Sequence, residues 1–394
     1  LRGLRIVTFI AELNGLLLWS TDVGNAYLES MTEEKVCFIA GSEFGKLAGH
    51  LLVIKKALYG LRSSGKQWHD RLFDALFEMG FQPSKAEPDI WMKEVDGLYE
   101  YVAVYVDDLA IASKNPKAIT DYLEGHHKFK LKGTGPIGYH LGMDFFRDDD
   151  GVLCVSPKKY IKKMVGTYEQ LFGQKPNVAV RSPLEKGDHP ELDDTDLLEE
   201  NEIVIYQSLI GALQWVISIG RFDIQTAVMS LSSFRVAPRK GHLDRVKRVY
   251  GYLCKMNEAT IRVRTEVPDY SDLPSQVFDW SRSVYGETTE DMPHDAPVPR
   301  GKTVRVTHYV DANLMHDVIT GKSVTGILHL LNQTPIDWYA KKQATIETAT
   351  YGSEFVAART CVEQSVDIRN TLRYLGVPVE NSSYMFGDNK AVVD

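Results

Sequence analysis

The spacing of apolar residues predicts that helices and strands alternate along the first part of the chain. In residues 3–14 (GLRIVTFIAELN) and 64–80 (SGKQWHDRLFDALFEMG), apolar positions recur every three or four residues, as on the buried face of an amphipathic helix. Residues 15–22 (GLLLWSTD) contain a continuous apolar run that is typical of a buried strand, and this strand would end at Asp22. The chain therefore begins as a mixture of α and β elements.

Two apolar runs, at 100–106 (EYVAVYV) and 109–113 (LAIAS), flank the adjacent acids Asp107 and Asp108. This pattern predicts a β-hairpin with apolar arms and an acidic tip. Two neighbouring carboxylates repel each other, so a rigid tip is a costly place for them unless a cation binds there. Taken alone, the Asp-Asp pair is also explained by the preference of turns for Asp.

The second half of the chain continues this alternation around one irregular segment. Residues 151–165 (GVLCVSPKKYIKKMV) predict a strand followed by a basic helix. Residues 265–302 are rich in Pro, Ser, Asp and Glu and lack periodicity, which predicts a linker or a loosely packed excursion. The other expected elements are helices at 206–220, 222–234, 241–253 and 346–376, and strands at 303–312, 324–331 and 383–388.

The composition is that of an ordinary globular protein with more than one domain. The 394 residues are too many for one ordinary core, and 44% of them are hydrophobic and 25% charged. No run reaches the roughly 18 apolar residues of a membrane helix, and no signal peptide is visible, although targeting information could lie outside the sequence. The scattered cysteines predict an intracellular protein. Because residue 1 is Leu, we expect the chain to be a piece of a longer one. The widely spaced cysteines predict reduced core residues: Cys37, Cys154, Cys254 and Cys361.

The net charge of −8 argues mildly against nucleic acid as a partner, but the positive charges are clustered. Basic residues gather at 55–66, 158–163 and 235–248. Local basic stripes on an acidic protein can still follow a phosphate backbone. The alternative is that each cluster is a solvated helix face.

Asp22 changes the interpretation of the acidic hairpin tip. It ends a separate buried strand, so it would supply a third carboxylate beside Asp107 and Asp108. Three acids from two neighbouring strands form the ligand set of a two-metal phosphoryl-transfer site. Mg²⁺ prefers a few carboxylates together with substrate phosphates, and Mn²⁺ is the alternative ion.

Several sequence blocks, in this order, resemble the reverse transcriptases of Ty/copia-type retrotransposons. They are TDVGNAYL (21–28), KKALYGLRSSGKQW (55–68), YVDD (105–108), YHLGMDF (139–145), YQSLIGALQWV (206–216) and RFDIQTAVMSLSSF (221–234). The resemblance covers nearly the whole chain. It implies an α+β fold, in which a polymerase palm of helices and antiparallel sheet precedes an α/β ribonuclease H-like domain. Gly65 and Phe222 stand where the family usually has Pro, which loosens local turns but leaves the acids in place.

The resemblance also implies roles for single residues of the first part. The metal-binding acids of the palm would be Asp22, Asp107 and Asp108. Tyr27 would lie beneath the sugar of the incoming nucleotide, unless it is an ordinary core aromatic. The residues beside the nucleotide and template would be Tyr59, Gly60 and Arg62. Alternatively, Gly60 is only a turn residue, and Arg62 is a solvated surface charge. The block YHLGM resembles the primer grip.

Three acids in the last part resemble the metal ligands of the family's ribonuclease H domain: Asp311 (HYVDAN), Glu354 (TATYGSEFVAA) and Asp388 (YMFGDNKAVVD). Such a strand–helix–strand carboxylate cluster suits two Mg²⁺ ions that cleave a phosphodiester with water. Glu354 alone could be a surface helix acid. The family's fourth acid would lie beyond Asp394, and its fingers strands would precede residue 1.

From these observations we expect an RNA-directed DNA polymerase with an associated ribonuclease H activity. Its partners would be an RNA template, a DNA primer or RNA–DNA hybrid, and deoxynucleoside triphosphates, in a cytoplasmic virus-like particle or the nucleus. The expected segments are a palm with partial fingers and thumb (1–200), a helical thumb or connection (201–264), the linker (265–302) and a ribonuclease H-like domain (303–394). The alternatives are a catalytically incomplete or co-opted fragment that only binds nucleic acid or protein, and a ribonuclease H-like hydrolase with an inert palm.

Overall fold

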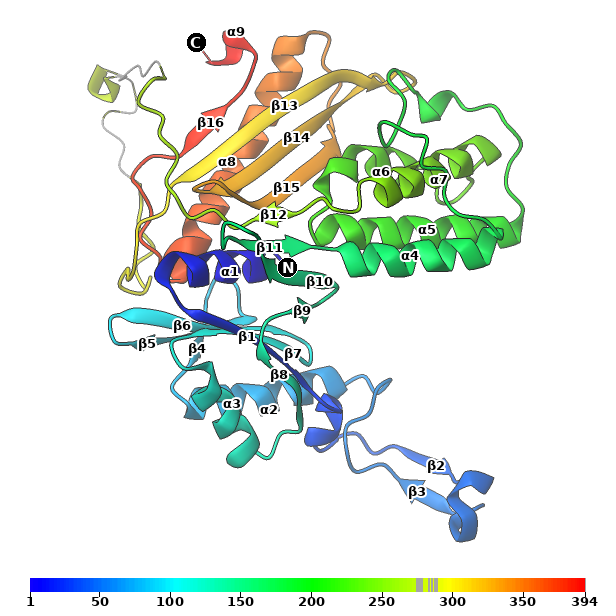
Figure 1. Ribbon diagram of the computed structural model, residues 1–394, viewed down its shortest axis with the longest axis vertical. Coiled ribbons are helices and arrows are strands. Elements are labelled where there is room, and N and C mark those ends of the chain that lie inside the picture. The colour runs from blue at the N-terminus through cyan, green and yellow to red at the C-terminus, as the bar shows by residue number, and fades with distance from the viewer. Residues whose placement is uncertain (274–278, 283, 285, 287–289, 394) are drawn as a thin grey trace. The chain divides into compact units, whose positions relative to one another are not determined.

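The computed structural model describes residues 1–273, 279–282, 284, 286 and 290–393 (Figure 1). The chain divides into two compact units, one formed by Leu13–His140 and the other by Leu1–Glu12 with Leu141–Asp394. Both units combine helices with mainly antiparallel sheets, so the mixed α+β class is confirmed. The four-segment division expected from the sequence is finer than these two units and stays a prediction.

The unit Leu13–His140 is built on a six-stranded antiparallel sheet with the order β4-β5-β6-β7-β1-β8. Its helices α2 (Ser64–Glu78) and α3 (Pro116–Gly125) lie on one face of this sheet (Figure 1). The strands are β1 (Leu17–Val23), β4 (Gln82–Pro83), β5 (Ile90–Val95), β6 (Leu98–Tyr105), β7 (Asp108–Ser113) and β8 (Leu131–Pro136), with β9 (Tyr139–His140) at the end of the unit. The predicted first strand, acidic hairpin and second helix are confirmed.

Helix α2 packs on the sheet because its apolar residues recur at helical spacing on one face. Trp68, Leu72 and Leu76 are at most 3% exposed and belong to the same hydrophobic cluster as Leu109 and Ile111 of β7. Burying such side chains stabilises the fold by about 1.5–3 kcal/mol each. The interface therefore fixes the helix against the strand that begins at Asp108.

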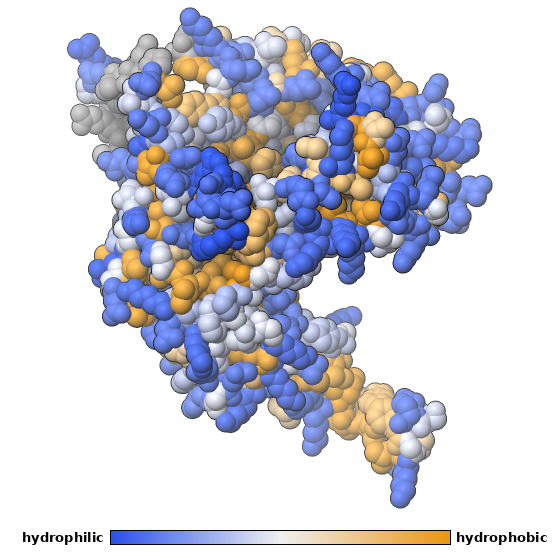
Figure 2. All heavy atoms as spheres, in the orientation of Figure 1, coloured by the Kyte–Doolittle hydropathy of each residue, from blue (hydrophilic) through white to orange (hydrophobic). Residues whose placement is uncertain are grey.

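A second hairpin in this unit, β2 (Cys37–Ile39) paired with β3 (Leu51–Val53), carries exposed apolar side chains. Ile39, Leu51 and Val53 are 59–72% exposed, and Figure 2 shows hydrophobic atoms gathered over this hairpin. The sequence did not predict these strands. Cys37 lies here and is exposed, so the prediction that all four cysteines are core residues is wrong for this one; all four are free thiols.

The other unit contains α1 (Arg2–Asn14), which begins the chain as predicted, and a packed group of helices. Tyr206, Leu213, Val246 and Tyr250 lie in their shared core and are at most 2% exposed. The helices are α4 (Lys158–Phe172), α5 (Glu200–Ser218), α6 (Gln225–Ser232) and α7 (Lys240–Lys255), and three short strands of this unit are β10 (Met143–Arg147), β11 (Leu153–Ser156) and β12 (Ile261–Arg262).

The basic cluster at 235–248 is engaged with acids of the same unit. Arg245 donates hydrogen bonds to Asp188 and Asp193, and Arg248 pairs with Glu185 at 2.8 Å. These ion pairs favour the structural reading of this cluster over a free phosphate-binding stripe.

The C-terminal part of this unit is a four-stranded sheet with the order β15-β14-β13-β16, in which only the β13–β16 pair is parallel. Helix α8 (Thr350–Tyr374) covers one face of this sheet (Figure 1). It begins four residues later than the sequence pattern predicted, and β15 was not predicted as a strand. The strands are β13 (Val306–Asp317), β14 (Lys322–Leu331), β15 (Thr334–Lys342) and β16 (Tyr384–Phe386), followed by a short helix, α9 (Lys390–Val393).

The predicted linker at 265–302 falls partly outside the described residues, at 274–278, 283, 285 and 287–289. Its described residue Glu290 forms ion pairs with Arg369 and Arg373 of α8. The pKa of Glu290 is lowered to about 2, mainly by the hydrogen bonds that its carboxylate accepts from Arg369. Residue 290 is thus tied to α8. Among the described residues, no helix combines the length and the apolar character needed to cross a membrane.

Candidate active sites

The three acids predicted for the palm lie together at one end of the six-stranded sheet. Asp22 on β1 is directly opposite Asp108 on β7. Tyr105 pairs with Asp108, so Val106 and Asp107 form the two-residue loop between β6 and β7. The backbone N–H of Val23 donates to the carbonyl oxygen of Asp107 at 2.8 Å. Strand pairing therefore brings two distant segments of the sequence to one acidic edge.

The electrostatics of this edge show that the acids interact. Burial, followed by the charges of Asp107 and Asp22, raises the pKa of Asp108 to about 6. The pKa of Asp22 is also raised, first by burial and then by Asp107, while Lys132 on β8 opposes the shift. A carboxylate at such a position is stabilised by a cation.

The donor set fits a hard divalent ion, because it consists of carboxylate oxygens. The side chains are half-buried and open to solvent. In the described part of the chain, three clusters have metal-ligating atoms within 4.8 Å of one another, and the three palm acids are not among them.

Tyr27 and Tyr59 are placed beside the palm acids by the turn that follows β1. A Cβ at Gly24 would lie 2.7 Å from Lys132 Cε, and Asn25 adopts a left-handed conformation with φ 58°. The turn leads into a short 3₁₀ segment, and the ring centroids of Tyr27 and Tyr59 lie 4.3 Å apart. The hydroxyl of Tyr59 donates to Asp107 Oδ2 at 3.3 Å.

Gly60 and Arg62 do not take part in the contacts that join Tyr27, Tyr59 and Asp107. Gly60 is exposed with φ 99°, a conformation that favours glycine, so the turn reading suffices for it. Arg62 is exposed and lies near Glu34: hydrogen bonds from Ser63 lower the pKa of Glu34, and the charge of Arg62 adds to this. Their roles beside a nucleotide stay predictions.

The acids predicted for the second site converge in the C-terminal sheet. The carboxylates of Asp311 on β13, Glu354 on α8 and Asp388 after β16 lie within 4.8 Å of one another. Glu354 is 9% exposed, whereas the two aspartates are exposed. Burial raises the pKa of Glu354; a hydrogen bond from the backbone of Ala312 opposes this, and the two aspartates reinforce it. This cluster is compact enough to hold a divalent ion, and its oxygens suit Mg²⁺ or Mn²⁺.

A cavity of about 560 Å³ adjoins Asp311 and Asp388. Its walls are rich in aromatic side chains: Tyr309, Trp338, Tyr339, Phe386 and Phe222. Gln225 and Thr226 of α6 line the same cavity. Aromatic faces beside a carboxylate cluster can hold nucleobases or sugars next to reacting phosphates.

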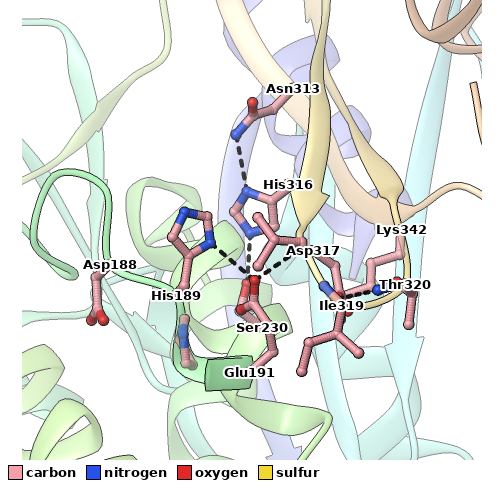
Figure 3. Close-up of polar contacts among 12 residues, drawn as sticks. Asp188, His189, Glu191, Ser230, Asn313, His316, Asp317, Ile319, Thr320 and Lys342 are labelled. Carbon is pink, nitrogen blue, oxygen red and sulfur yellow. Dashed lines mark hydrogen bonds and ion pairs between the residues drawn. The ribbon is translucent and has the colours of Figure 1, made fainter. Parts of the chain in front are cut away.

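Polar contacts hold the far end of β13 against α6 (Figure 3). Asn313 Nδ2 bonds to His316 Nδ1 at 2.9 Å, and His316 Nε2 bonds to Ser230 Oγ of α6 at 3.0 Å. Nearby, Lys342 pairs with Asp317 at 2.5 Å. Although burial acts in the opposite direction, Lys342 and backbone N–H groups lower the pKa of Asp317 to about 2. These contacts fix the strand that carries Asp311.

Two histidine-containing clusters also have ligand-like spacing, but their hydrogen bonds explain them without a metal. In the first, His308 and His329 face each other across β13 and β14 with Nδ1 atoms 2.7 Å apart. Their Nε2 atoms contact Ser365 Oγ and Gln364 Oε1, each at 2.8 Å, so one chain of donors and acceptors satisfies both neutral rings.

The second cluster joins Glu78, His126 and His127. Arg71 Nη1 lies 3.1 Å from His127 Nδ1 and can only donate there. The Nδ1 of neutral His127 is therefore an acceptor and its Nε2 carries the proton, which disfavours a metal at Nε2.

Sequence reasoning missed two residues near the palm acids. Lys132 is paired with Asp22 across β1 and β8, and Trp68 donates to the backbone of the acidic hairpin loop. The signals for Trp68 were its position on the apolar face of the predicted helix and its place at the end of the block KKALYGLRSSGKQW (55–68). Lys132 gave no signal, because its partner strand is fixed by tertiary pairing.

Comparison with known proteins shows which families the chain is similar to. Residues 1–181 match the family described as reverse transcriptase (RNA-dependent DNA polymerase). The chain is 24% identical over 393 residues to the retrovirus-related Pol polyprotein from transposon RE1 of Arabidopsis thaliana, an alignment that covers 98% of this chain and 24% of that protein. It is also 24% identical over 405 residues to the corresponding polyprotein from transposon TNT 1-94 of Nicotiana tabacum, covering 100% and 27%.

A third relative is shorter. The chain is 25% identical over 349 residues to a putative transposon Ty5-1 protein of Saccharomyces cerevisiae, covering 86% of this chain and 99% of that protein. The fold and the matched region define a reverse transcriptase domain. The chain is similar over nearly all of its length to Pol polyproteins of retrotransposons, and it spans about a quarter of the length of the two plant relatives.

Proposed function

We propose that this chain carries the polymerase active site of an RNA-directed DNA polymerase. The observation that carries the proposal is the convergence of Asp22, Asp107 and Asp108 at one sheet edge, with the pKa of Asp108 raised to about 6. The match of residues 1–181 to the reverse transcriptase family supports it. The polymerase would act intracellularly, in a virus-like particle or the nucleus.

In this proposal the three acids hold two divalent ions, which would activate the primer hydroxyl and neutralise the pyrophosphate that leaves. The chain's own residues position the substrates. Tyr27 stacks beneath the sugar of the deoxynucleoside triphosphate, and Tyr59, which contacts both Tyr27 and Asp107, supports that ring. Lys132 compensates the charge of Asp22 until the ions bind.

A second activity is favoured by the cluster of Asp311, Glu354 and Asp388. We infer that these acids form a ribonuclease H site for the RNA strand of an RNA–DNA hybrid. Their mutual spacing within 4.8 Å and the aromatic cavity beside two of them support this inference. The linker at 265–302 and the ribonuclease H-like domain at 303–394 belong to the same proposal.

The experiment is primer extension on an RNA template by the full-length protein, with Mg²⁺ and deoxynucleotides. Asp107→Asn should lower the rate of synthesis about a thousandfold, equivalent to about 4 kcal/mol of barrier, because a metal-binding acid is lost. The matched control is Asp121→Asn, which removes an exposed acid of α3 that pairs with Lys117. Synthesis by Asp107→Asn above a tenth of the wild-type rate would contradict the assignment. An inactive wild type that still binds hybrid would support the alternative of a binding module.

A further inference from the structure

The loop that carries Asp107 contains a strained residue. Val106 has φ 59°, a left-handed conformation that β-branched residues rarely adopt. Asp107, the second residue of this two-residue loop, has no such positive φ. A positive φ at only the first of the two loop residues matches a type II′ turn. This turn favours Gly at its first central position, where this chain has Val. Strain of this kind persists only where surrounding contacts enforce it.

One such contact comes from helix α2. The indole N–H of Trp68 donates a hydrogen bond of 2.7 Å to the carbonyl oxygen of Val106. Trp68 is 2% exposed, and its ring lies 5.5 Å from that of Phe129 between centroids. The donor is therefore held in place by the core of the unit.

The carbonyl oxygen of Val106 belongs to the peptide that joins Val106 to Asp107. Rotation of this peptide changes ψ of Val106 and φ of Asp107 together, and so redirects the Asp107 carboxylate. Trp68 fixes the peptide before Asp107, and the N–H of Val23 fixes the peptide after it. The loop is thus held from α2 on one side and from β1 on the other.

We propose that Trp68 is a positioning residue for polymerisation, which holds the strained Val106–Asp107 peptide in the orientation that aims Asp107 at the metal site. This inference rests on the polymerase function proposed above. The plain alternative is that Trp68 only fills the core. The two roles predict different kinetics for a variant that loses the indole N–H but keeps an aromatic ring.

The test compares Trp68→Phe with Trp91→Phe in the full-length protein. Trp91 is also 2% exposed and belongs to the same hydrophobic cluster, so both variants lose an indole from one core. Trp68→Phe should lower kcat for single-nucleotide addition roughly 10- to 100-fold relative to Trp91→Phe, with KM for the nucleotide little changed, since small misplacements of catalytic groups have effects of this size. Melting curves should show similar loss of stability in both variants.

A second variant tests the strain itself. Glycine adopts a positive φ without a steric penalty, so Val106→Gly in the Trp68→Phe background should recover part of the lost kcat. Equal kcat for Trp68→Phe and Trp91→Phe, or no recovery in the double variant, would overturn the proposal. If the wild type and Trp91→Phe fail to extend a primer, the polymerase proposal itself is contradicted, which separates the two failures.

Discussion

Asp22 and Asp108 face each other directly on the neighbouring strands β1 and β7, although like charges in this position destabilise a sheet. Burial raises the pKa of both acids; the charge of Asp107 adds to both shifts, and the charge of Asp22 adds to the shift of Asp108. A protein keeps such an arrangement at sites where a bound cation reverses the sign of the interaction.

This repulsion predicts that activity and stability change in opposite directions in Asp22→Asn. Without divalent ions the variant should unfold at a temperature a few degrees higher than the wild type, because it loses a repulsion on the order of 0.5–1 kcal/mol that outweighs the opposing attraction of Asp22 to Lys132. Primer extension should fall about a thousandfold. Thermal melting in EDTA and extension assays with Mg²⁺ measure the two effects. A lower melting temperature in EDTA would show that Asp22 stabilises the metal-free fold and would contradict this account.

Tyr27 is expected to select against ribonucleotides. Its ring would clash with a ribose 2′-hydroxyl and stack under deoxyribose, so Tyr27→Ala should reduce the preference for deoxynucleotides by roughly 1–3 kcal/mol. Tyr27→Phe keeps the ring and should keep the preference. Single-nucleotide incorporation with matched ribo- and deoxynucleotides measures the ratio. If Tyr27 were only a core aromatic, the alanine variant would lose about 3–5 kcal/mol of stability with unchanged selectivity.

Glu354→Gln is expected to separate the two activities. Cleavage of the RNA strand of a hybrid should stop because the compact cluster with Asp311 and Asp388 loses a ligand, while polymerisation should persist on the separate acids of the palm. The control is Glu363→Gln, an exposed acid of the same helix that pairs with Arg359. Both assays should be run on the same full-length protein. Loss of both activities in a folded Glu354→Gln protein would contradict the two-site model.

The buried pair His308 and His329 predicts a dependence of stability on pH. Burial, followed by the neighbouring His329, lowers the pKa of His308 to about 3, and burial also lowers the pKa of His329. Between the pKa of folded His308, about 3, and that of an unfolded histidine, about 6.5, the unfolded chain binds a proton that the folded chain does not. The free energy of unfolding therefore rises with pH over this range, and the contribution of the histidine is fully present above about pH 6.5. The slope contributed by each ring is at most about 1.4 kcal/mol per pH unit.

Urea unfolding from pH 7 to pH 4 measures this contribution. Carboxylates such as Glu290 also lose stabilising ion pairs in acid, so the comparison is with the double variant His308→Leu, His329→Leu. The loss of stability on acidification should be shallower in the double variant. Equal slopes would show that the pair does not resist protonation.

Much of the local structure could be predicted from the sequence, because periods of 3.6 and 2 residues specify which faces are apolar. The helix at 64–80, the hairpin around Asp107 and the strand that ends near Asp22 follow from this pattern and are present. The ordered sequence blocks indicated the polymerase family, which the match of residues 1–181 supports, and the palm acids, whose roles stay predictions. The late start of α8 at Thr350 and the strand β15 were missed, since apolar spacing alone does not place element boundaries.

The tertiary structure decided which residues from distant parts of the sequence are in contact. The opposition of Asp22 and Asp108, the bond from Trp68 to Val106 and the pairing of His308 with His329 each join residues far apart in the sequence. Strand register and helix packing set these contacts, and burial then sets the pKa values of the groups involved. The sequence by itself determined which residues are candidates for the chemistry; only the folded chain determined their distances, their protonation and the strain of the loop that holds Asp107, because these depend on through-space contacts that no local pattern encodes.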